Sequence, residues 1–228
     1  MTRPVVLVHG WGGSFAATWQ SSGFTHLLAD AGREVVGVDL LGHGGAPKPH
    51  DPEAYADLTT RVLDAMPDTP VDAIGFSLGA MTLLRIAAAL PERFAHLVLA
   101  GIGGTLFDDD TTGTERIIAA LEGRGDPDDN IGHMFSNYAN QPGNDLAALT
   151  AVMKRPRGAR FTPEALVGVT CPTLVVIGDK DFAGPGEPLA AAIPGGQLVT
   201  LRNVDHFATP ESFGFIDAAL EFIDAVPA

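Results

Sequence analysis

The stretch Gly75-Phe-Ser-Leu-Gly79 decides the fold of this sequence. An apolar run, residues 71–76, leads into it, and a helical pattern, residues 78–90, follows it. A serine between two glycines at such a junction is typical of a tight strand-to-helix turn, because side chains at the flanking positions would collide with neighbouring backbone. The turn projects the Ser77 hydroxyl away from the sheet, beside helical N–H groups that suit a developing negative charge. We therefore interpret Ser77 as a candidate nucleophile, against the alternative of a capping serine in a glycine-lined turn.

Short apolar runs alternate with longer helical patterns over most of the chain. The runs are rich in Val, Leu and Ile without strict alternation, as expected of parallel strands that helices bury on both faces. The sequence therefore predicts an α/β fold with a doubly wound, mainly parallel sheet of six strands. The predicted strands are residues 4–8, 34–40, 71–76, 97–100, 173–177 and 197–201. The predicted helices between them are residues 25–31, 52–65, 78–90, 188–192 and 210–225.

Residues 103–170, the insert, interrupt this alternation between the fourth and fifth predicted strands. Connections in α/β units usually have about 2–6 residues, and much longer ones are functional lids or surface decoration. We expect a lid, because a solvated loop would not need the apolar side chains Phe107, Met134, Phe135, Tyr138 and Met153. Helices are predicted in it at 114–121, 131–138 and 144–154. The predicted domain organisation is thus a core of residues 1–102 and 171–228 with a helical lid over 103–170.

The composition narrows the classes of partner. The 228 residues suit one domain, and 14 Lys and Arg against 28 Asp and Glu give a formal net charge of −14. Such acidity argues against nucleic acid and anionic membranes as partners, and it favours neutral substrates over acidic ones. The single cysteine, Cys171, excludes an intramolecular disulfide, and we expect it to be buried and inert. No His, Asp and Cys residues cluster at ligand spacing, so we expect neither a metal nor an organic cofactor.

No targeting segment or membrane span is predicted. The apolar run before His9 is much shorter than the roughly 7–15 residues of a signal peptide. No run approaches the roughly 18 apolar residues of a membrane span. We expect a cytoplasmic monomer or small homo-oligomer.

A nucleophilic serine needs a histidine base and a carboxylate that orients it. Of the seven histidines, only His206 lies in a loop just past the last predicted strand. Two carboxylates, Asp179 and Asp181, follow the fifth predicted strand. Because the carboxyl ends of parallel strands meet at one edge of the sheet, we expect these side chains to lie near Ser77.

The chain resembles the α/β-hydrolase superfamily over essentially its whole length. The resemblance is carried by His9-Gly-Trp-Gly-Gly13, Asp39-Leu-Leu-Gly-His-Gly44, Gly75-Phe-Ser-Leu-Gly79, Gly178-Asp-Lys-Asp181 and His206. The order of serine, acid and histidine in that family implies a triad of Ser77, Asp181 and His206. Its Gly-x-x-Asp pattern favours Asp181 over Asp179. It also implies that the backbone N–H groups of Trp11 and Leu78 form the oxyanion hole.

Other positions depart from the family pattern or carry no chemistry. The first predicted strand leads almost directly into His9, so we expect no N-terminal antiparallel hairpin and an all-parallel sheet. The insert matches no lid that we identify. We expect His9 to hold its loop by hydrogen bonds, and His43 to lie near the rim of the cleft with no assigned role.

The resemblance implies a serine hydrolase that cleaves a small, neutral carboxylic ester through an acyl-enzyme on Ser77. Trp11, Leu78, Phe182 and Phe207 flank the expected catalytic positions and are candidates for the wall of the pocket. A serine nucleophile argues against haloalkane dehalogenase and epoxide hydrolase chemistry, which use aspartate in this superfamily. Thioesterase, lactonase and carbon–carbon bond hydrolase activities need the same residues and stay open. A non-catalytic ligand-binding protein of the same fold is the alternative from another class, although the intact triad argues against it.

Overall fold

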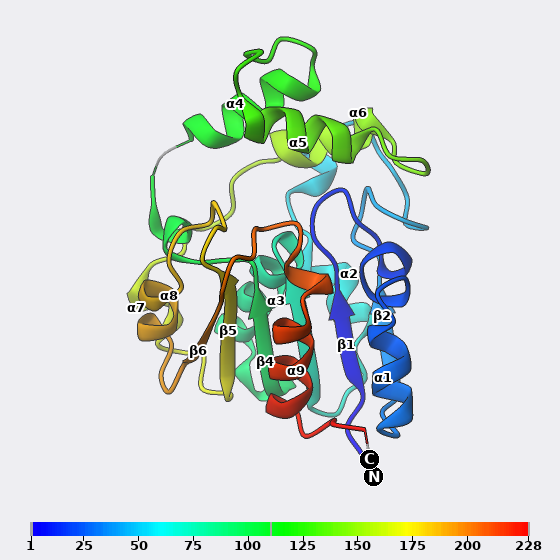
Figure 1. Ribbon diagram of the computed structural model, residues 1–228, viewed down its shortest axis with the longest axis vertical. Helices are drawn as coiled ribbons and strands as arrows, with labels where there is room; N and C mark the ends of the chain where they lie inside the picture. The colour runs from blue at the N-terminus through cyan, green and yellow to red at the C-terminus, as the bar shows by residue number, and fades with distance from the viewer. Residues whose placement is uncertain (1, 110, 228) are drawn as a thin grey trace.

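The computed structural model describes residues 2–109 and 111–227, which form one sheet flanked by helices (Figure 1). The sheet has six strands in the order β2-β1-β3-β4-β5-β6, and every neighbouring pair is parallel. The strands are β1 (Val5–Val8), β2 (Val35–Val38), β3 (Val71–Phe76), β4 (Phe94–Ala100), β5 (Thr173–Gly178) and β6 (Gln197–Leu201). The prediction of a doubly wound, six-stranded parallel sheet is confirmed for the described residues.

The sheet separates two apolar layers, because successive side chains of a strand point to opposite faces. In β1, Val6 and Val8 pack into one layer, whereas Val5 and Leu7 pack into the other. The first layer is covered by α2 (Thr59–Ala65), α3 (Leu78–Ala89) and α8 (Glu187–Ala192), and the second by α1 (Phe24–Asp30) and α9 (Phe213–Phe222) (Figure 1). Burial on both faces explains why the strands read as continuous apolar runs.

Two predicted helices are broken in the structure, and each break has a local cause. The predicted helix 52–65 is divided into a 3-10 turn, η2 (Pro52–Tyr55), and α2. Between them, the Asp57 carboxylate accepts a hydrogen bond of 2.7 Å from the N–H of Thr59, so a new helix begins there. The predicted helix 210–225 is likewise divided, at Ser212, into η5 (Thr209–Glu211) and α9. Four short elements were not predicted: η1 (Ala16–Gln20), η3 (Pro91–Arg93), η4 (Gly104–Phe107) and α7 (Pro163–Leu166).

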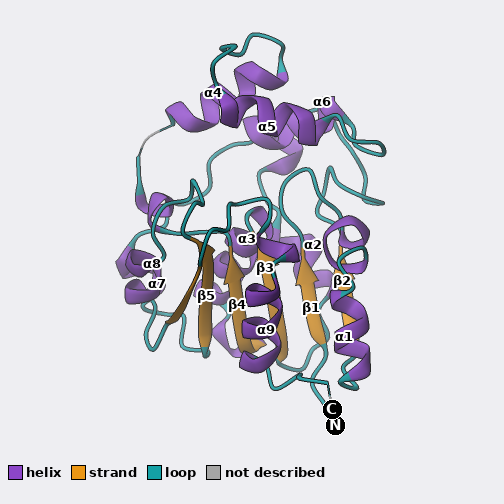
Figure 2. Cartoon of the chain, viewed as in Figure 1, coloured by secondary structure: helices purple, strands orange, loops and turns teal. Residues whose placement is uncertain are grey.

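The insert contributes three longer helices that lie beyond the carboxyl ends of the strands. Figure 2 shows them as a layer of their own: α4 (Thr112–Leu121), α5 (Asn130–Ala139) and α6 (Leu146–Lys154). Asp145 caps α6 by accepting a 3.0 Å hydrogen bond from the N–H of Ala148. Leu149 and Val152 of α6 are buried in the same apolar layer as α3, so this helix is packed on the core. Of the helices in the described ranges, none has the length and hydropathy that crossing a membrane requires.

A buried ionic network closes the opposite, amino-terminal end of the sheet. The Asp72 carboxylate is fully buried, and one of its oxygens pairs with the guanidinium of Arg33. Its other oxygen lies 3.3 Å from Nε of Arg3 and 2.8 Å from Nδ1 of His96. Arg33 also donates a 2.8 Å hydrogen bond to the carbonyl of Ile223, just after α9. The network thus ties β3 and β4 to the segment before β1 and to the last helix.

Candidate active site

Ser77 lies in the turn between β3 and α3, and its backbone has a φ of 51°. Residues other than glycine rarely adopt a positive φ of this size, because their Cβ atom then crowds the backbone. A Cβ atom on Gly75 would lie 2.7 Å from the Cα of Ala80, and one on Gly79 would lie 2.4 Å from the carbonyl oxygen of Val8. Both glycines are therefore required by the close approach of backbone, which is the reason inferred from the sequence.

The ring of His206, in the loop after β6, lies between Ser77 and Asp181. Its Nε2 is 3.0 Å from the Ser77 Oγ, and its Nδ1 is 2.9 Å from both carboxylate oxygens of Asp181. When Nδ1 carries the proton and donates it to the carboxylate, Nε2 is an acceptor that faces the serine hydroxyl. Asp181 and His206 are only 8% and 4% exposed, so water is largely excluded from the bond between them.

Asp179, the other carboxylate considered from the sequence, is directed elsewhere. It is exposed, and its Oδ1 accepts a 2.7 Å hydrogen bond from the N–H of Asn203. The carboxylate of Asp181, by contrast, also accepts a 2.9 Å hydrogen bond from the N–H of Ala183, which fixes its orientation toward the histidine. The structure therefore brings Asp181 to His206, and it does not bring Asp179 there.

Trp11 and Leu78 belong to two segments that adjoin Ser77, a loop and the start of a helix. Leu78 is the first residue of α3, so its N–H has no acceptor within the helix. Trp11 lies in the loop of residues 9–13 after β1, called the β1 loop below, and a Cβ atom on Gly10 of this loop would lie 3.3 Å from the Cβ of Ser77. Within the described ranges, neither N–H donates to a protein acceptor. Both are thus available to an oxygen atom bound next to Ser77.

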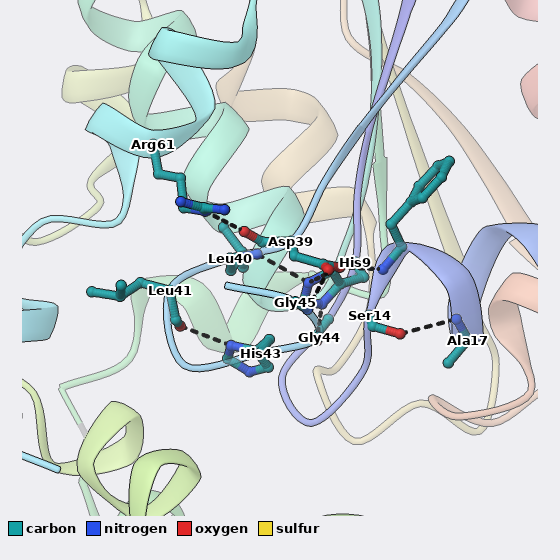
Figure 3. A network of polar contacts seen from close by, with 12 residues as sticks. His9, Ser14, Ala17, Asp39, Leu40, Leu41, His43, Gly44, Gly45 and Arg61 are labelled. Carbon is teal, nitrogen blue, oxygen red and sulfur yellow. Dashed lines mark hydrogen bonds and ion pairs between the residues drawn. The ribbon is translucent and has the colours of Figure 1, made fainter. Parts of the chain in front are cut away.

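A polar network holds the β1 loop from the side of the core (Figure 3). His9 directs Nδ1 at the carbonyl of the next residue, at 2.7 Å, and its Nε2 accepts a 3.1 Å hydrogen bond from the N–H of Leu40. The Asp39 carboxylate accepts hydrogen bonds of 2.7 Å from the N–H groups of Phe15 and Gly45. His9 and Asp39 therefore join the loops after β1 and β2. Both ring nitrogens of His9 are engaged in hydrogen bonds that hold these loops.

His43 is buried in the same network, not exposed at a rim. Its Nδ1 lies 2.9 Å from the carbonyl of Leu41, and its ring centroid is 5.1 Å from that of His9. Burial above all, and the neighbouring His9 next, lower the pKa of His43 from its ordinary value of 6.5 to about 3. Burial lowers the pKa of His9 as well. Both rings are therefore neutral at physiological pH.

We expect the neutral, buried His43 to make the fold sensitive to acid. Above pH 6.5 the ring is neutral in both the folded and the unfolded chain, whereas below it only the unfolded chain takes up the proton, until about pH 3. The free energy of unfolding should then fall by about 1.4 kcal/mol per pH unit from this residue alone. His43→Asn, which keeps a donor for the Leu41 carbonyl, should remove that slope between about pH 6 and 4.

Urea unfolding at several pH values measures this slope. His26→Asn is the matched control, because His26 is exposed and its replacement should leave the slope unchanged. Equal slopes for the wild type and His43→Asn would contradict the prediction.

Aromatic rings pack around the buried ring of His206. The centroid of Phe182 is 4.3 Å from that of the histidine, and the centroid of Phe207 is 5.4 Å away. The α5 helix of the insert adds Phe135, 5.6 Å from Phe207, and Tyr138, 5.4 Å from Phe207. Trp11 of the β1 loop completes the group by packing 5.3 Å from Phe135. Phe182, Phe207 and Trp11 were proposed from the sequence as candidates for the wall of the pocket. Which residues of the insert contact them could not be predicted from the sequence.

Cys171, which the sequence predicts to be buried and inert, is buried just before β5. Burial raises the pKa of its thiol, so little reactive thiolate is present at neutral pH.

Known proteins resemble this chain throughout the sheet and the site. The family model for the "Alpha/beta hydrolase family" matches residues 5–225. The pimeloyl-(acyl-carrier protein) methyl ester esterase of Neisseria meningitidis serogroup A is 29% identical over 240 residues, which cover 90% of this chain and 71% of that protein. The 2-hydroxymuconate semialdehyde hydrolase of Pseudomonas sp. strain CF600 is 32% identical over 108 residues, 46% of this chain and 38% of that protein.

The fold has close parallels among solved structures. One of them is the structure of a serine hydrolase involved in carbazole degradation, the CarC enzyme. Its TM-score is 0.70 at 26% sequence identity, and the match covers 97% of this chain and 91% of that one. The family match, in turn, includes all six strands, the Ser77 turn and the loop of His206. The chain therefore belongs to the alpha/beta hydrolase family.

Proposed function

We propose that this protein is a serine hydrolase that cleaves a small, neutral carboxylic ester through an acyl-enzyme on Ser77. The observation that carries the proposal is the continuous hydrogen-bonded series from Asp181 through His206 to the Ser77 hydroxyl, with distances of 2.9 and 3.0 Å. A serine hydroxyl is a weak nucleophile without such a base. Ester hydrolysis is also the activity that the name of the Neisseria relative states for that protein.

In the first half of the reaction, the Ser77 Oγ attacks the carbonyl carbon of the ester while His206 Nε2 takes the hydroxyl proton. Asp181 stabilises the imidazolium that forms and holds its tautomer. The carbonyl oxygen becomes an oxyanion, which accepts hydrogen bonds from the N–H groups of Trp11 and Leu78. In other serine hydrolases such a donor contributes about 3–4 kcal/mol. The imidazolium then gives its proton to the departing alkoxide, which leaves as an alcohol.

In the second half, water takes the place of the alcohol. His206 Nε2 removes a proton from it, and the hydroxide attacks the acyl carbon bound to Ser77. The second oxyanion uses the same two N–H donors. When it collapses, the Ser77 oxygen leaves and recovers its proton from the imidazolium, and the carboxylic acid is released.

The surroundings of His206 support an apolar, uncharged substrate. The rings of Phe135, Tyr138, Phe182 and Phe207 lie on the side of the site toward the insert, and apolar walls bind acyl or alkyl groups by excluding water. The formal net charge of −14 sets up a long-range field that repels anionic substrates.

A second candidate function is hydrolysis of a carbon–carbon bond next to a carbonyl. It is favoured by the Pseudomonas relative, a semialdehyde hydrolase, over 46% of this chain. The ester hydrolase is preferred because the esterase relative covers 90% of the chain. Thioesters and lactones need the same serine chemistry, so the substrate panel includes them.

A fluorophosphonate probe tests the nucleophile directly. We expect the native protein to be labelled and Ser77→Ala to remain unlabelled. Ser21→Ala is the matched control, because Ser21 is exposed in another part of the chain and should label like the wild type. Native protein that is folded by circular dichroism and yet remains unlabelled would overturn the proposal in favour of a non-catalytic binding protein.

A panel of p-nitrophenyl esters of increasing acyl length, with a thioester, a lactone and a vinylogous 1,5-diketone, identifies the bond that is cleaved. We expect the highest kcat/KM for a short ester. A higher value for the diketone would establish the second candidate instead.

A further inference from the structure

We infer that Asn144, in the turn between α5 and α6, is a positioning residue that holds the β1 loop in the orientation required for oxyanion binding. Its amide Nδ2 donates a 2.9 Å hydrogen bond to the carbonyl of Gly12 and a 3.1 Å hydrogen bond to the carbonyl of Tyr138. Both protons of the amide are thus used, one toward the β1 loop and one toward α5. The inference rests on the proposed function, because it concerns the oxyanion site of that reaction.

Two further contacts from the insert reach the same two residues of the β1 loop. The ring of Tyr138 packs on Gly12 so closely that a Cβ atom there would lie 2.6 Å from its Cδ1. The indole Nε1 of Trp11 donates a 3.0 Å hydrogen bond to the carbonyl of Leu149, in α6. Residues 11 and 12 are therefore held by contacts with α5, α6 and the turn between them.

The core holds the β1 loop from its other side. There the His9 ring accepts a hydrogen bond from the loop after β2. Within the β1 loop itself, the N–H of Gly13 donates a 3.1 Å hydrogen bond to the carbonyl of Gly10. Gly12 has a φ of 73°, in a region that glycine adopts easily and from which it also departs easily. The carbonyl that Asn144 binds belongs to the peptide between Gly12 and Gly13, so loss of this bond would loosen the turn that directly follows Trp11. The insert thus adds restraints on residues 11 and 12 to those that hold His9 on the side of the core.

This restriction matters for the chemistry because an oxyanion donor acts only when charge has developed on the substrate oxygen. An N–H held in the correct direction beforehand requires no reorganisation at that moment. Loss of the Asn144 bonds should therefore lower the rate of the chemical step and leave substrate binding almost unchanged. Removal of one whole donor costs about 10²–10³-fold in kcat, and a misdirected donor should cost less, about 10- to 100-fold.

The kinetic test compares Asn144→Leu, which keeps the side-chain volume and removes the donors, with Asn140→Leu. Asn140 is the matched control, since its Nδ2 donates a 2.8 Å hydrogen bond to the Ser136 carbonyl at an exposed site. We expect Asn144→Leu to lower kcat about 10- to 100-fold with KM within about twofold of the wild type, and Asn140→Leu to change neither. The affinity for an aryl boronic acid, whose adduct with Ser77 places an oxygen at the oxyanion site, should fall by the same factor as kcat.

A spectroscopic readout does not depend on catalysis. The chain has two tryptophans, and Trp19 is fully buried in the other apolar layer, so Trp19→Phe leaves Trp11 as the only indole fluorophore. In that background, Asn144→Leu should shift the emission of Trp11 to longer wavelength, because the indole gains contact with water. Asn140→Leu should not shift it.

The outcomes separate this inference from the proposed function. If the wild type hydrolyses esters and Asn144→Leu has unchanged kcat and unchanged Trp11 emission, the inference is wrong and the proposed function stands. If Asn144→Leu raises KM and lowers the unfolding midpoint while its kcat is preserved, Asn144 has only a structural role and the inference is also wrong. If the wild type neither reacts with the fluorophosphonate nor hydrolyses any ester of the panel, it is the proposed function that fails.

Discussion

Asp181→Asn is expected to lower kcat about 10⁴-fold on a p-nitrophenyl ester while the protein stays folded. In a serine protease, the corresponding change keeps the geometry but leaves the histidine in the wrong tautomer, with a loss of about 10⁴ in kcat. Here Nδ1 of His206 donates to both oxygens of Asp181 at 2.9 Å. With an amide in that place, the NH₂ group can turn toward Nδ1, and the proton then stays on Nε2, which no longer accepts from Ser77.

Asp179→Asn is the control for this substitution, because it makes the same change in charge and shape two residues away. Asp179 is exposed and accepts a hydrogen bond from the N–H of Asn203, away from His206, so its replacement should leave kcat within about twofold. Steady-state kinetics of both variants, with circular dichroism to confirm folding, measures the difference. A loss of activity confined to Asp179→Asn would show that the acid has been assigned to the wrong carboxylate.

Asp72→Ala is expected to lower the free energy of unfolding by about 3–5 kcal/mol, the usual result of removing one partner from a buried ion pair. The Asp72 carboxylate is fully buried, and Arg33, its partner, is only 7% exposed. Without the carboxylate, the guanidinium of Arg33 keeps its hydrogen bond to Ile223 but has lost its counter-charge in a place that water hardly reaches. Urea unfolding, followed by circular dichroism, measures the loss.

Glu122→Ala is the matched control, because Glu122 also pairs with two cations, Arg124 and Lys154, but on the surface. Water and salt screen ion pairs at the surface, so this variant should lose little stability. Asp72→Ala that remains folded should keep the kcat of the wild type, because Asp72 lies at the end of the sheet opposite to Ser77. Equal losses of stability in the two variants would contradict the distinction between buried and exposed pairs.

The sequence was sufficient to predict the sheet, because a strand that is buried on both faces leaves a continuous apolar run. The parallel arrangement of the strands also explains where the candidate site lies. Ser77, Asp181 and His206 follow β3, β5 and β6, whose carboxyl ends lie at one edge of the sheet. Helix boundaries were less predictable where a polar side chain interrupts the pattern: the Asp57 carboxylate accepts a hydrogen bond from the N–H of Thr59, at the point where the apparent helix 52–65 is divided.

The support of the site could not be predicted, because it depends on contacts between residues far apart in the chain. Asn144 and Gly12 are separated by 132 positions, and a side-chain amide bound to a backbone carbonyl leaves no periodic pattern in either segment. His43 illustrates the same limit. The sequence indicated its loop, but whether the ring is at the surface or buried depends on its packing against residues distant in the chain, such as His9.

The positive φ of Ser77 means that stability and catalysis favour different residues at this position. A side chain held in such a conformation costs on the order of 1–3 kcal/mol, whereas glycine adopts it almost freely. Selection for thermal stability alone would therefore replace Ser77 with glycine and remove the hydroxyl on which the proposed chemistry depends. Libraries screened only for resistance to heat should accumulate that substitution, so stabilised variants of this protein have to be selected for turnover at the same time.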